Sequence, residues 1–296
     1  MLHRDSTVPH WLTDLVDDAA IFPPGNMPLE QAVAEHHGHR SSEYAALVGG
    51  FVVSDVKIPD LLEVLDERDD DAPLAVNVVV TGGAGAIEPA VRWASRSPLL
   101  RLTALECALR DEDDLVHNAR RVGAVLDALE EDLSDVTVYV EPPRVVGWPS
   151  HGWLGAIDEL ALRELPLKLR TGGVTADAFP TTVELAASIS AALDRELPFK
   201  CTAGLHHALR QTDPQTGFAH HGFLNVLAAT RACLDGGSTE AALDQTDGPA
   251  LLADLDEAAL DRTRRWFTGF GTCSILEPHD DLVELGLVQH ETGAAS

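Results

Sequence analysis

The sequence predicts an α/β protein whose architecture is a single (βα)8 TIM-type barrel. Short β-rich runs alternate with helical runs about eight times, which is the pattern of a closed parallel sheet with helices outside. The chain has 296 residues, close to the length of about 250 that such a barrel needs. Hydrophobic residues make up 45% of it, enough for one large core. A doubly wound open parallel sheet is the alternative.

The first half of the chain contains four expected strands, each followed by a helix. Pro59 suits the first turn of the second helix, and acidic residues at the start of the fourth favour a helix N-terminus. The expected strands are residues 19–22, 47–53, 74–80 and 99–105, and the expected helices are residues 29–36, 59–65, 87–95 and 113–129.

The second half repeats the alternation and ends in a short tail. The expected strands are residues 136–140, 165–169, 198–202 and 266–275, and the expected helices are residues 181–193, 222–234, 249–264 and 278–285. Strands separated by helices connect as right-handed βαβ units, so the strands are expected to be parallel. We expect residues 1–288 to form one barrel domain and residues 289–296 to be a flexible C-terminal tail.

The charge balance excludes two classes of partner. The formal net charge is −27, and such a chain repels nucleic acid and anionic membrane surfaces. The first twenty residues contain four aspartates and lack the apolar segment of a signal peptide, and the four cysteines have no C-x-x-C spacing. We therefore expect a cytoplasmic protein with a small-molecule substrate, and the sequence leaves its oligomeric state open.

Lysine is rare in this chain. Only Lys57, Lys168 and Lys200 occur among 21 basic residues, so arginine supplies most of the positive charge. Unlike arginine, a lysine can lose its proton and act as a nucleophile. Two of the three lysines lie on the sixth and seventh expected strands, which makes them the first candidates for catalysis.

Charged residues gather near the ends of four consecutive expected strands. Glu106 and Glu141 end the fourth and fifth, and Lys168 and Lys200 lie on the next two. Catalytic groups of barrel enzymes come from such strand ends, and residues two apart on a strand share a face. We expect the four side chains to form a coupled acid–base cluster, or alternatively a structural ion-pair layer.

Further polar residues flank this cluster. The turn Arg170-Thr171-Gly172-Gly173 can bring backbone N–H groups close to an anion, with Arg170 beside it. Thr202 shares a face with Lys200, and Gly204 and His207 belong to the following turn; the run 269–272 is a second candidate phosphate site. Asp18, Phe22, Asn77 and Thr81 are weaker candidates for lining the pocket.

The histidines occur in adjacent pairs. His206 follows the seventh strand and is a candidate general acid or base. A divalent metal held by His206, His220 and Glu141 is an alternative, although the chain has no H-E-x-x-H or H-x-H pattern. No cofactor is otherwise expected.

Two resemblances follow from these motifs. The segments 22–24 (FPP), 200–207 (KCTAGLHH) and 221–225 (HGFLN) resemble a family of uncharacterised bacterial barrel proteins, and this resemblance implies no particular reaction. Residues 165–204 are similar to class I aldolases of the deoxyribose-phosphate aldolase type, which place a Schiff-base lysine on strand six before a Thr-Gly turn. Those aldolases place a second lysine on strand seven, before a glycine-rich phosphate turn.

The match to these aldolases has two departures. Leu169 stands where that family has threonine directly after its first lysine, and Leu205-His206-His207 stands where it has glycine. The resemblance nevertheless implies amine chemistry at one of the two lysines.

Three functions are consistent with these residues. The first is an enzyme that acts on a small anionic oxo or phosphorylated metabolite by lysine-dependent lyase or proton-transfer chemistry. Lys200 is favoured as the amine or base, and Lys168 is expected to lower its pKa by repulsion between like charges. The second is a metal-assisted hydrolase or lyase using His206, His220 and Glu141. The third is a barrel without catalysis that binds a small anion.

Overall fold

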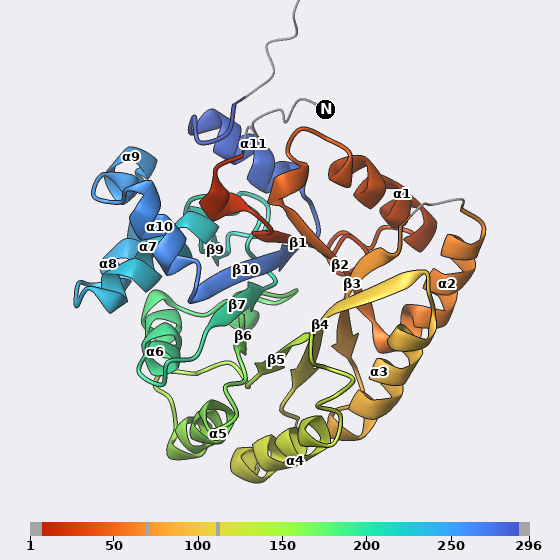
Figure 1. Ribbon diagram of the computed structural model, residues 1–296. Coiled ribbons are helices and arrows are strands. Elements are labelled where there is room, and N and C mark those ends of the chain that lie inside the picture. The colour runs from red at the N-terminus through yellow and green to blue at the C-terminus, as the bar shows by residue number, and fades with distance from the viewer. Residues whose placement is uncertain (1–7, 69–71, 111–112, 290–296) are drawn as a thin grey trace, which may run out of the picture.

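Eight parallel strands close into a barrel in the computed structural model, which describes residues 8–68, 72–110 and 113–289 (Figure 1). Around the barrel the order is β1-β10-β7-β6-β5-β4-β3-β2, so each strand lies beside its neighbours in the chain and β1 closes against β10. The barrel strands are β1 Val16–Asp18, β2 Val48–Ser54, β3 Leu74–Val80, β4 Leu100–Ala108, β5 Thr137–Glu141, β6 Leu167–Arg170, β7 Phe199–Thr202 and β10 Phe267–Thr272. The predicted TIM-type barrel is confirmed.

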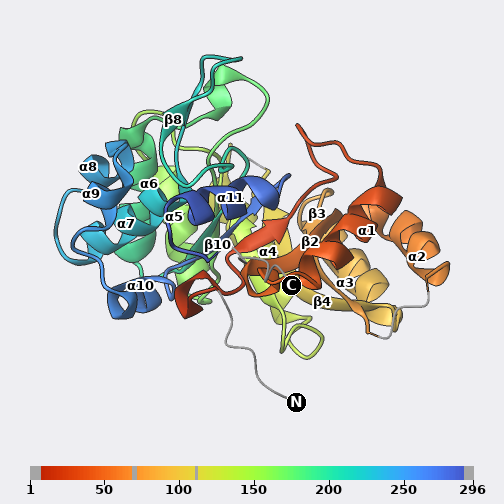
Figure 2. The ribbon, with the colours of Figure 1, turned by 90° about the horizontal axis from the view of Figure 1, so that it is seen from above.

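Helices form a ring outside the barrel and cover its outer face (Figures 1 and 2). They are α1 Leu29–Arg40, α2 Ile58–Asp66, α3 Ile87–Arg96, α4 Leu115–Asp127, α5 His151–Ala161, α6 Thr182–Leu193, α7 Phe223–Leu234, α8 Thr239–Asp244, α9 Gly248–Leu252, α10 Glu257–Thr263 and α11 Leu276–Glu284. Local sequence fixes several starts: Asp114 caps α4, Ser150 caps α5, and Thr181 with Glu184 forms a capping box on α6.

The hydrophobic core lies between strands and helices. Alternate strand residues such as Leu167, Leu169, Phe199 and Cys201 are buried, and they belong to one core cluster with apolar residues of the helices. The other face of these strands points into the barrel and contains charged side chains. This division follows from the alternation of side chains along a strand.

The first strand is not where the sequence placed it. The apolar run 19–22 forms a turn, in which the Phe22 N–H donates to the Ala19 carbonyl at 2.8 Å. The strand is the preceding segment, Val16–Asp18, whose two aspartates concealed it from a search for apolar runs. Asp18 points away from the barrel axis to His36, at 2.9 Å, which is how one of these charges is accommodated in the interior.

Other differences lie in the connections. Helix α5, which Ser150 caps, was not expected between the fifth and sixth strands. The expected helix 249–264 divides into α9 and α10, separated near Asp256, which caps α10. After β7 the chain forms an unexpected hairpin, β8 Gln211–Thr212 with β9 Ala219–His220, which projects from one end of the barrel in Figure 2.

Two expectations concern the limits of the chain and membranes. Of the expected C-terminal tail, residues 290–296 lie outside the described residues, as do residues 1–7. Within the described ranges, no helix combines the length and apolar character needed to cross a bilayer.

Candidate active site in the barrel interior

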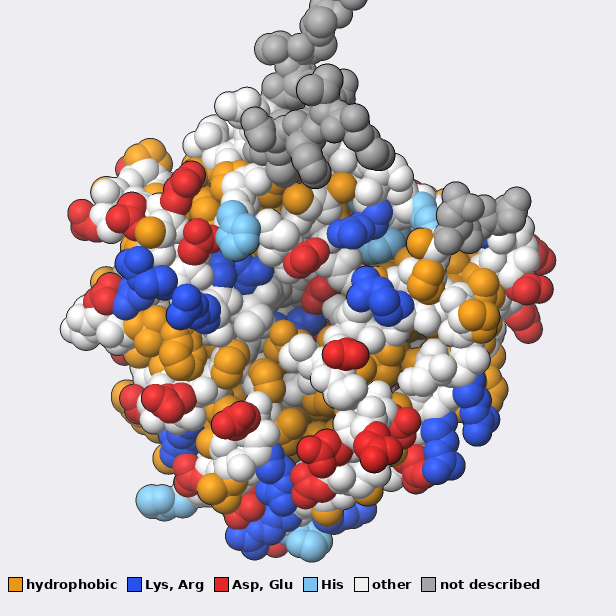
Figure 3. All heavy atoms as spheres, in the orientation of Figure 1, with side chains coloured by type: hydrophobic (Ala, Val, Ile, Leu, Met, Phe, Trp, Pro, Cys, Tyr) orange, Lys and Arg blue, Asp and Glu red, His pale blue; other side chains and the backbone are white. Residues whose placement is uncertain are grey.

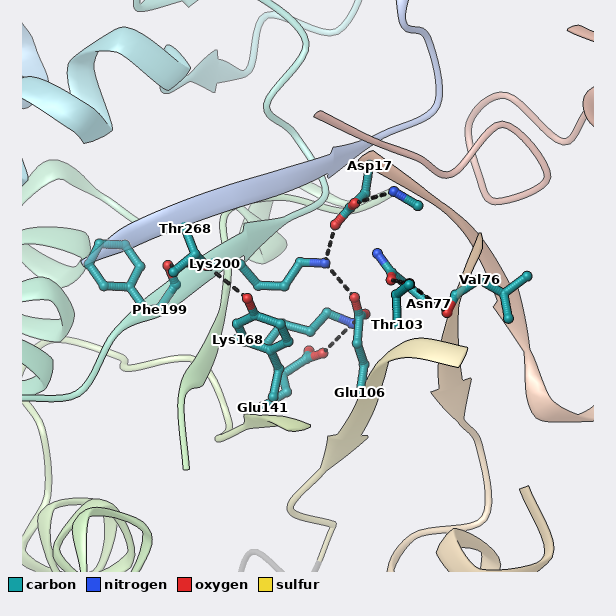
Figure 4. Close-up of polar contacts among 12 residues, drawn as sticks. Asp17, Val76, Asn77, Thr103, Glu106, Glu141, Lys168, Phe199, Lys200 and Thr268 are labelled. Atoms are coloured by element: carbon teal, nitrogen blue, oxygen red, sulfur yellow. Dashed lines mark hydrogen bonds and ion pairs between the residues drawn. The ribbon is translucent and has the colours of Figure 1, made fainter. Parts of the chain in front are cut away.

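The centre of the site is one carboxylate shared by two ammonium groups. Glu106 Oε1 lies 2.6 Å from Lys200 Nζ, and Glu106 Oε2 lies 2.7 Å from Lys168 Nζ (Figure 4). All three side chains are buried, with exposed fractions of 3%, 2% and 5% for Glu106, Lys200 and Lys168. The lysines come from adjacent strands in register, Lys168 opposite Lys200, and Glu106 reaches them from β4. The cluster expected from the sequence therefore assembles inside the barrel.

Each lysine has a second carboxylate partner. Lys168 Nζ lies 3.1 Å from Glu141 Oε2, and Glu141 Oε1 accepts a hydrogen bond from Arg170 Nε at 2.8 Å. Lys200 Nζ donates to Asp17 Oδ2 at 2.5 Å, while the Gly50 N–H donates to Asp17 Oδ1 at 3.0 Å. The cluster thus contains three cations and three anions, and it is electrically balanced.

Asp17 is the residue that the sequence analysis missed. It lies on β1, in register with Gly271 of β10, so its side chain enters the barrel beside Lys200. The signal that could have identified it is the pair Asp17-Asp18 directly after Leu15-Val16, which places an acid on each face of a short strand. The expected strand began two residues too late to include it.

The carboxylates determine the charge state of both lysines. Burial lowers the pKa of Lys168 and of Lys200, but the neighbouring carboxylates outweigh burial, so both pKa values are raised. Burial raises the pKa of Glu106, but the two ammonium groups lower it to about 2. The expectation of a lowered lysine pKa is wrong for the resting site: repulsion from Lys200 does lower the pKa of Lys168, but attraction to Glu106 and Glu141 exceeds this repulsion.

Uncharged polar groups complete the interior. The Tyr139 ring lies 5.2 Å from Lys200 Nζ, and its hydroxyl is 3.0 Å from Thr268 Oγ1. On the opposite side, Asn77 accepts a hydrogen bond from Thr103 Oγ1 at 2.8 Å (Figure 4). The face in Figure 3 has a hollow near its centre, with acidic and basic side chains around and within it.

The glycine turns after β6 and β7 pack against each other. A Cβ on Gly172 would lie 2.7 Å from Gly204 Cα, so glycine is needed there for backbone contact. Thr171 is buried and donates to the Thr202 carbonyl at 3.2 Å, and Gly204 has a positive φ of 76°. Arg170 is 41% exposed at the edge of this turn, and its Nη1 and Nη2 donate to no group among the described residues.

The histidines form a separate group at the ends of β7 and β10. His206 Nδ1 lies 3.0 Å from Glu277 Oε2 and 3.9 Å from Cys273 Sγ, and His207 Nδ1 lies 3.1 Å from Asp281 Oδ2. Burial lowers the pKa of His206, but these partners raise it to about 9. His206 is therefore charged at neutral pH and already engaged by an acid.

The three residues proposed for a metal site do not form one group: the rings of His206 and His220 lie 6.4 Å apart, but Glu141 belongs to the lysine cluster. Glu141 is held by Lys168 and Arg170, whereas His206 is held by Glu277 and His220 stacks on Phe179 at 4.5 Å. Across the described ranges, no group of three or more His, Cys, Asp or Glu side chains has the arrangement of a metal site. The triad of His206, His220 and Glu141 is therefore not assembled.

Comparison with known proteins identifies the fold class and no family. No family model matches the chain, and no curated protein does. Among solved structures, a tetrameric deoxyribose phosphate aldolase from Aeropyrum pernix superposes with a TM-score of 0.53 and 11% identity, over 93% of this chain and 92% of that one. The carboxyl transferase domain of Rhizobium etli pyruvate carboxylase gives a TM-score of 0.39 and 13% identity, over 86% and 47%. At such identity the aldolase shows a shared barrel fold.

Proposed function

We propose that this protein is a lysine-dependent enzyme acting on a small oxo metabolite that carries an anionic group, by lyase or proton-transfer chemistry. The observation that carries the proposal is the buried Glu106, shared at 2.6 and 2.7 Å by two ammonium groups. Buried, coupled titratable groups at the carboxyl ends of barrel strands are typical of active sites. The likeness to an aldolase structure supports the barrel fold and nothing more specific.

Lys168 is the better candidate for the reacting amine. Its partner Glu141 is also the partner of Arg170, and the exposed fraction rises from 5% at Lys168 to 13% at Glu141 and 41% at Arg170. A substrate whose anionic group binds the outer edge of Arg170 would bring its carbonyl inward, toward Lys168. Lys200 is buried to 2% and its second acid, Asp17, is held by a backbone N–H. This favours Lys168 as the reacting amine, whereas the sequence alone favoured Lys200.

The covalent step balances if Lys168 first loses a proton. The neutral amine attacks the carbonyl carbon, and the carbonyl oxygen leaves as water after receiving two protons, one from the amine nitrogen and one returned by Glu141. The resulting iminium accepts the electron pair of a neighbouring C–C or C–H bond, whose other part departs as a carbonyl compound or as a proton. Glu141 at 3.1 Å is the adjacent acceptor for the departing proton. Lys200 and Glu106 then stabilise charge near the iminium without touching solvent.

A second candidate is favoured by the raised lysine pKa values. With both ammonium groups charged, they can polarise a carbonyl oxygen and stabilise an enolate, while Glu141 or Asp17 accepts the proton from carbon. This noncovalent proton transfer uses the same pocket and the same class of substrate. It differs in forming no bond between lysine and substrate.

Borohydride trapping distinguishes these functions. We expect pyruvate with borohydride to add one reduced adduct per chain, located at Lys168 by mass spectrometry. Lys168→Arg should abolish the adduct and Lys200→Arg should slow its formation, whereas Lys57→Arg, the third lysine and an exposed one paired with Asp60, should behave as wild type. Anion binding without an adduct but with α-proton exchange would support the enolate route. Binding with neither would support a non-catalytic barrel.

The pH profile of trapping is a second measurement on the same proteins. Because the Lys168 pKa is raised above its ordinary value of 10.5, the neutral fraction grows with pH throughout the neutral range. The trapping rate should therefore rise about tenfold per pH unit from pH 7 to pH 10. A plateau near neutral pH would contradict the charge state assigned to the resting site.

A further inference from the structure

Asn77 is the polar exception on its strand. The rest of β3 is leucine, valine and alanine, and Asn77 is only 4% exposed on the face that points into the barrel. Burying an amide is unfavourable unless its donors and acceptors find hydrogen bonds. The strand would pack more simply with another valine, so the presence of an amide calls for a partner.

Only one end of this amide has a partner. Thr103 Oγ1 donates to Asn77 Oδ1 at 2.8 Å and also lies 3.0 Å from the Val76 carbonyl, which fixes the orientation of the amide plane. Within the described ranges, no acceptor receives a hydrogen bond from Asn77 Nδ2. Figure 4 shows this nitrogen turned toward the centre of the cluster, on the side of Lys200 and Asp17.

Gly50 makes the space for this arrangement. A Cβ at Gly50 would lie 2.7 Å from Asn77 Oδ1 and 3.0 Å from Nδ2, so any other residue would displace the amide. The Gly50 N–H also donates to Asp17 Oδ1 at 3.0 Å. Asn77 and the Lys200–Asp17 pair therefore adjoin the same glycine, and glycine inside a strand is often found where another group approaches closely.

The hydrogen-bond inventory of the site indicates what it can receive. All six carboxylate oxygens of Asp17, Glu106 and Glu141 already accept from a lysine, an arginine or a backbone N–H. Each ammonium has three donors and uses two of them, so it retains one. Each carboxylate oxygen keeps a second lone pair, but the spare N–H groups of Lys168, Lys200 and Asn77 Nδ2 give the centre of the cluster three donors that match the oxygen atoms of a ligand.

We infer that Asn77 is a specificity-determining residue whose Nδ2 donates to a second oxygen atom of the substrate, a hydroxyl or oxo group next to the carbonyl held by the lysines. This inference rests on the proposed function and defines its substrate class as hydroxy-carbonyl or dicarbonyl compounds. Simple aldehydes and ketones offer this donor no oxygen atom beyond the carbonyl. A site built to bond a substrate hydroxyl discriminates strongly against an analogue that lacks it.

Paired probes test the inference. Borohydride trapping is measured with hydroxyacetone and acetone, and each rate is divided by the rate for N-acetyl-lysine methyl amide to remove intrinsic reactivity. The wild-type ratio should favour hydroxyacetone by at least about tenfold, and Asn77→Ala should bring it close to one. Thr103→Val keeps the amide but removes the hydrogen bond that orients it, and should therefore reduce the preference for hydroxyacetone partly. This variant replaces Asn77→Ala as the test if Asn77→Ala fails to fold.

A buried asparagine elsewhere is the matched control. Asn118 is 6% exposed on α4 and accepts from the Arg110 N–H, so Asn118→Ala should lower stability without altering the hydroxyacetone preference. If neither ketone is trapped, the covalent route of the proposed function fails, and the inference is then judged by thermal shifts with glycolate and acetate. A glycolate advantage that Asn77→Ala removes would support it. Equal shifts, or an unchanged trapping ratio in Asn77→Ala, would overturn it.

Discussion

The two halves of the charged cluster share Glu106 but end differently. On the β6 side, Lys168 pairs with Glu141, and Glu141 pairs in turn with Arg170, which is 41% exposed. On the β7 side, Lys200 pairs with Asp17, whose other oxygen accepts a hydrogen bond from the Gly50 N–H. Glu141 therefore keeps a cation if its lysine is lost, whereas Asp17 keeps only a backbone donor. The comparison separates a side suited to meeting a ligand from a side that holds the pair in place.

The largest effect should come from removing the shared partner. Glu106→Gln leaves two buried ammonium groups without the carboxylate between them, and breaking a buried ion pair typically costs about 3–5 kcal/mol of unfolding free energy. Denaturant unfolding measures this loss. Glu159→Gln, which breaks an ion pair with Arg120 on the helices, is the control and should change stability little.

Acid titration checks the same residue independently. The Glu106 pKa of about 2 lies below its ordinary value of 4.5, so its contribution to stability is complete above pH 4.5 and is lost as the pH falls toward 2. Wild type should therefore lose more stability over this range than Glu106→Gln does. Parallel curves for the two proteins would mean that Glu106 does not hold the lysines together.

The second effect compares the two lysines directly. Lys200→Met should cost about 3–5 kcal/mol because it leaves the half-buried Asp17 and the buried Glu106 without this ammonium group, and Asp17 then has only a backbone N–H. Lys168→Met should cost roughly half as much, since Glu141 retains Arg170 at 2.8 Å. Urea unfolding of both variants measures the difference.

A compensating substitution sharpens this result. Adding Asp17→Asn to Lys200→Met removes the unpaired charge and should recover part of the loss, in a double-mutant cycle. Adding Glu141→Gln to Lys168→Met should recover less. Equal losses at the two lysines, with equal recovery, would show that the halves of the cluster are equivalent.

The barrel and the cluster were predictable because both depend on local patterns. Alternating β-rich and helical runs predicted seven barrel strands close to their positions, and the alternation of side chains placed Lys168, Lys200 and Glu106 on inward faces. The first strand was not predictable from apolar runs, because its charges are neutralised by partners far along the chain, Lys200 for Asp17 and His36 for Asp18.

The electrostatics of the site could not be predicted from the same patterns. Whether the lysines repel each other or are held by acids depends on distances across the barrel, and Asp17 lies 183 residues from Lys200 in the chain. The expected metal triad of His206, His220 and Glu141 is not assembled for a related reason. His206 follows β7 and Glu141 ends β5, but Glu277 engages the histidine while Lys168 and Arg170 engage the glutamate, so a place at a strand end did not bring them together.

The smallest expected effect concerns Arg170, which is the outer end of the β6 side. Arg170 is 41% exposed and its loss leaves Glu141 paired with Lys168, so Arg170→Ala should barely change the free energy of unfolding. Its effect should fall on ligands instead. A charge-assisted hydrogen bond contributes about 1.5–3 kcal/mol, and because Arg170 is already shared with Glu141 we expect the low end, about a tenfold loss. Trapping of pyruvate should therefore slow about tenfold in Arg170→Ala while trapping of acetone, which has no anionic group, stays unchanged.

Arg170→Lys keeps the charge but not the planar donor pair, and its rate of pyruvate trapping should fall between those of wild type and Arg170→Ala. An equal decrease for both ketones would indicate a general disturbance of the pocket. Unchanged trapping of pyruvate would remove Arg170 from the substrate site and, with it, the reason for preferring the β6 side over the β7 side.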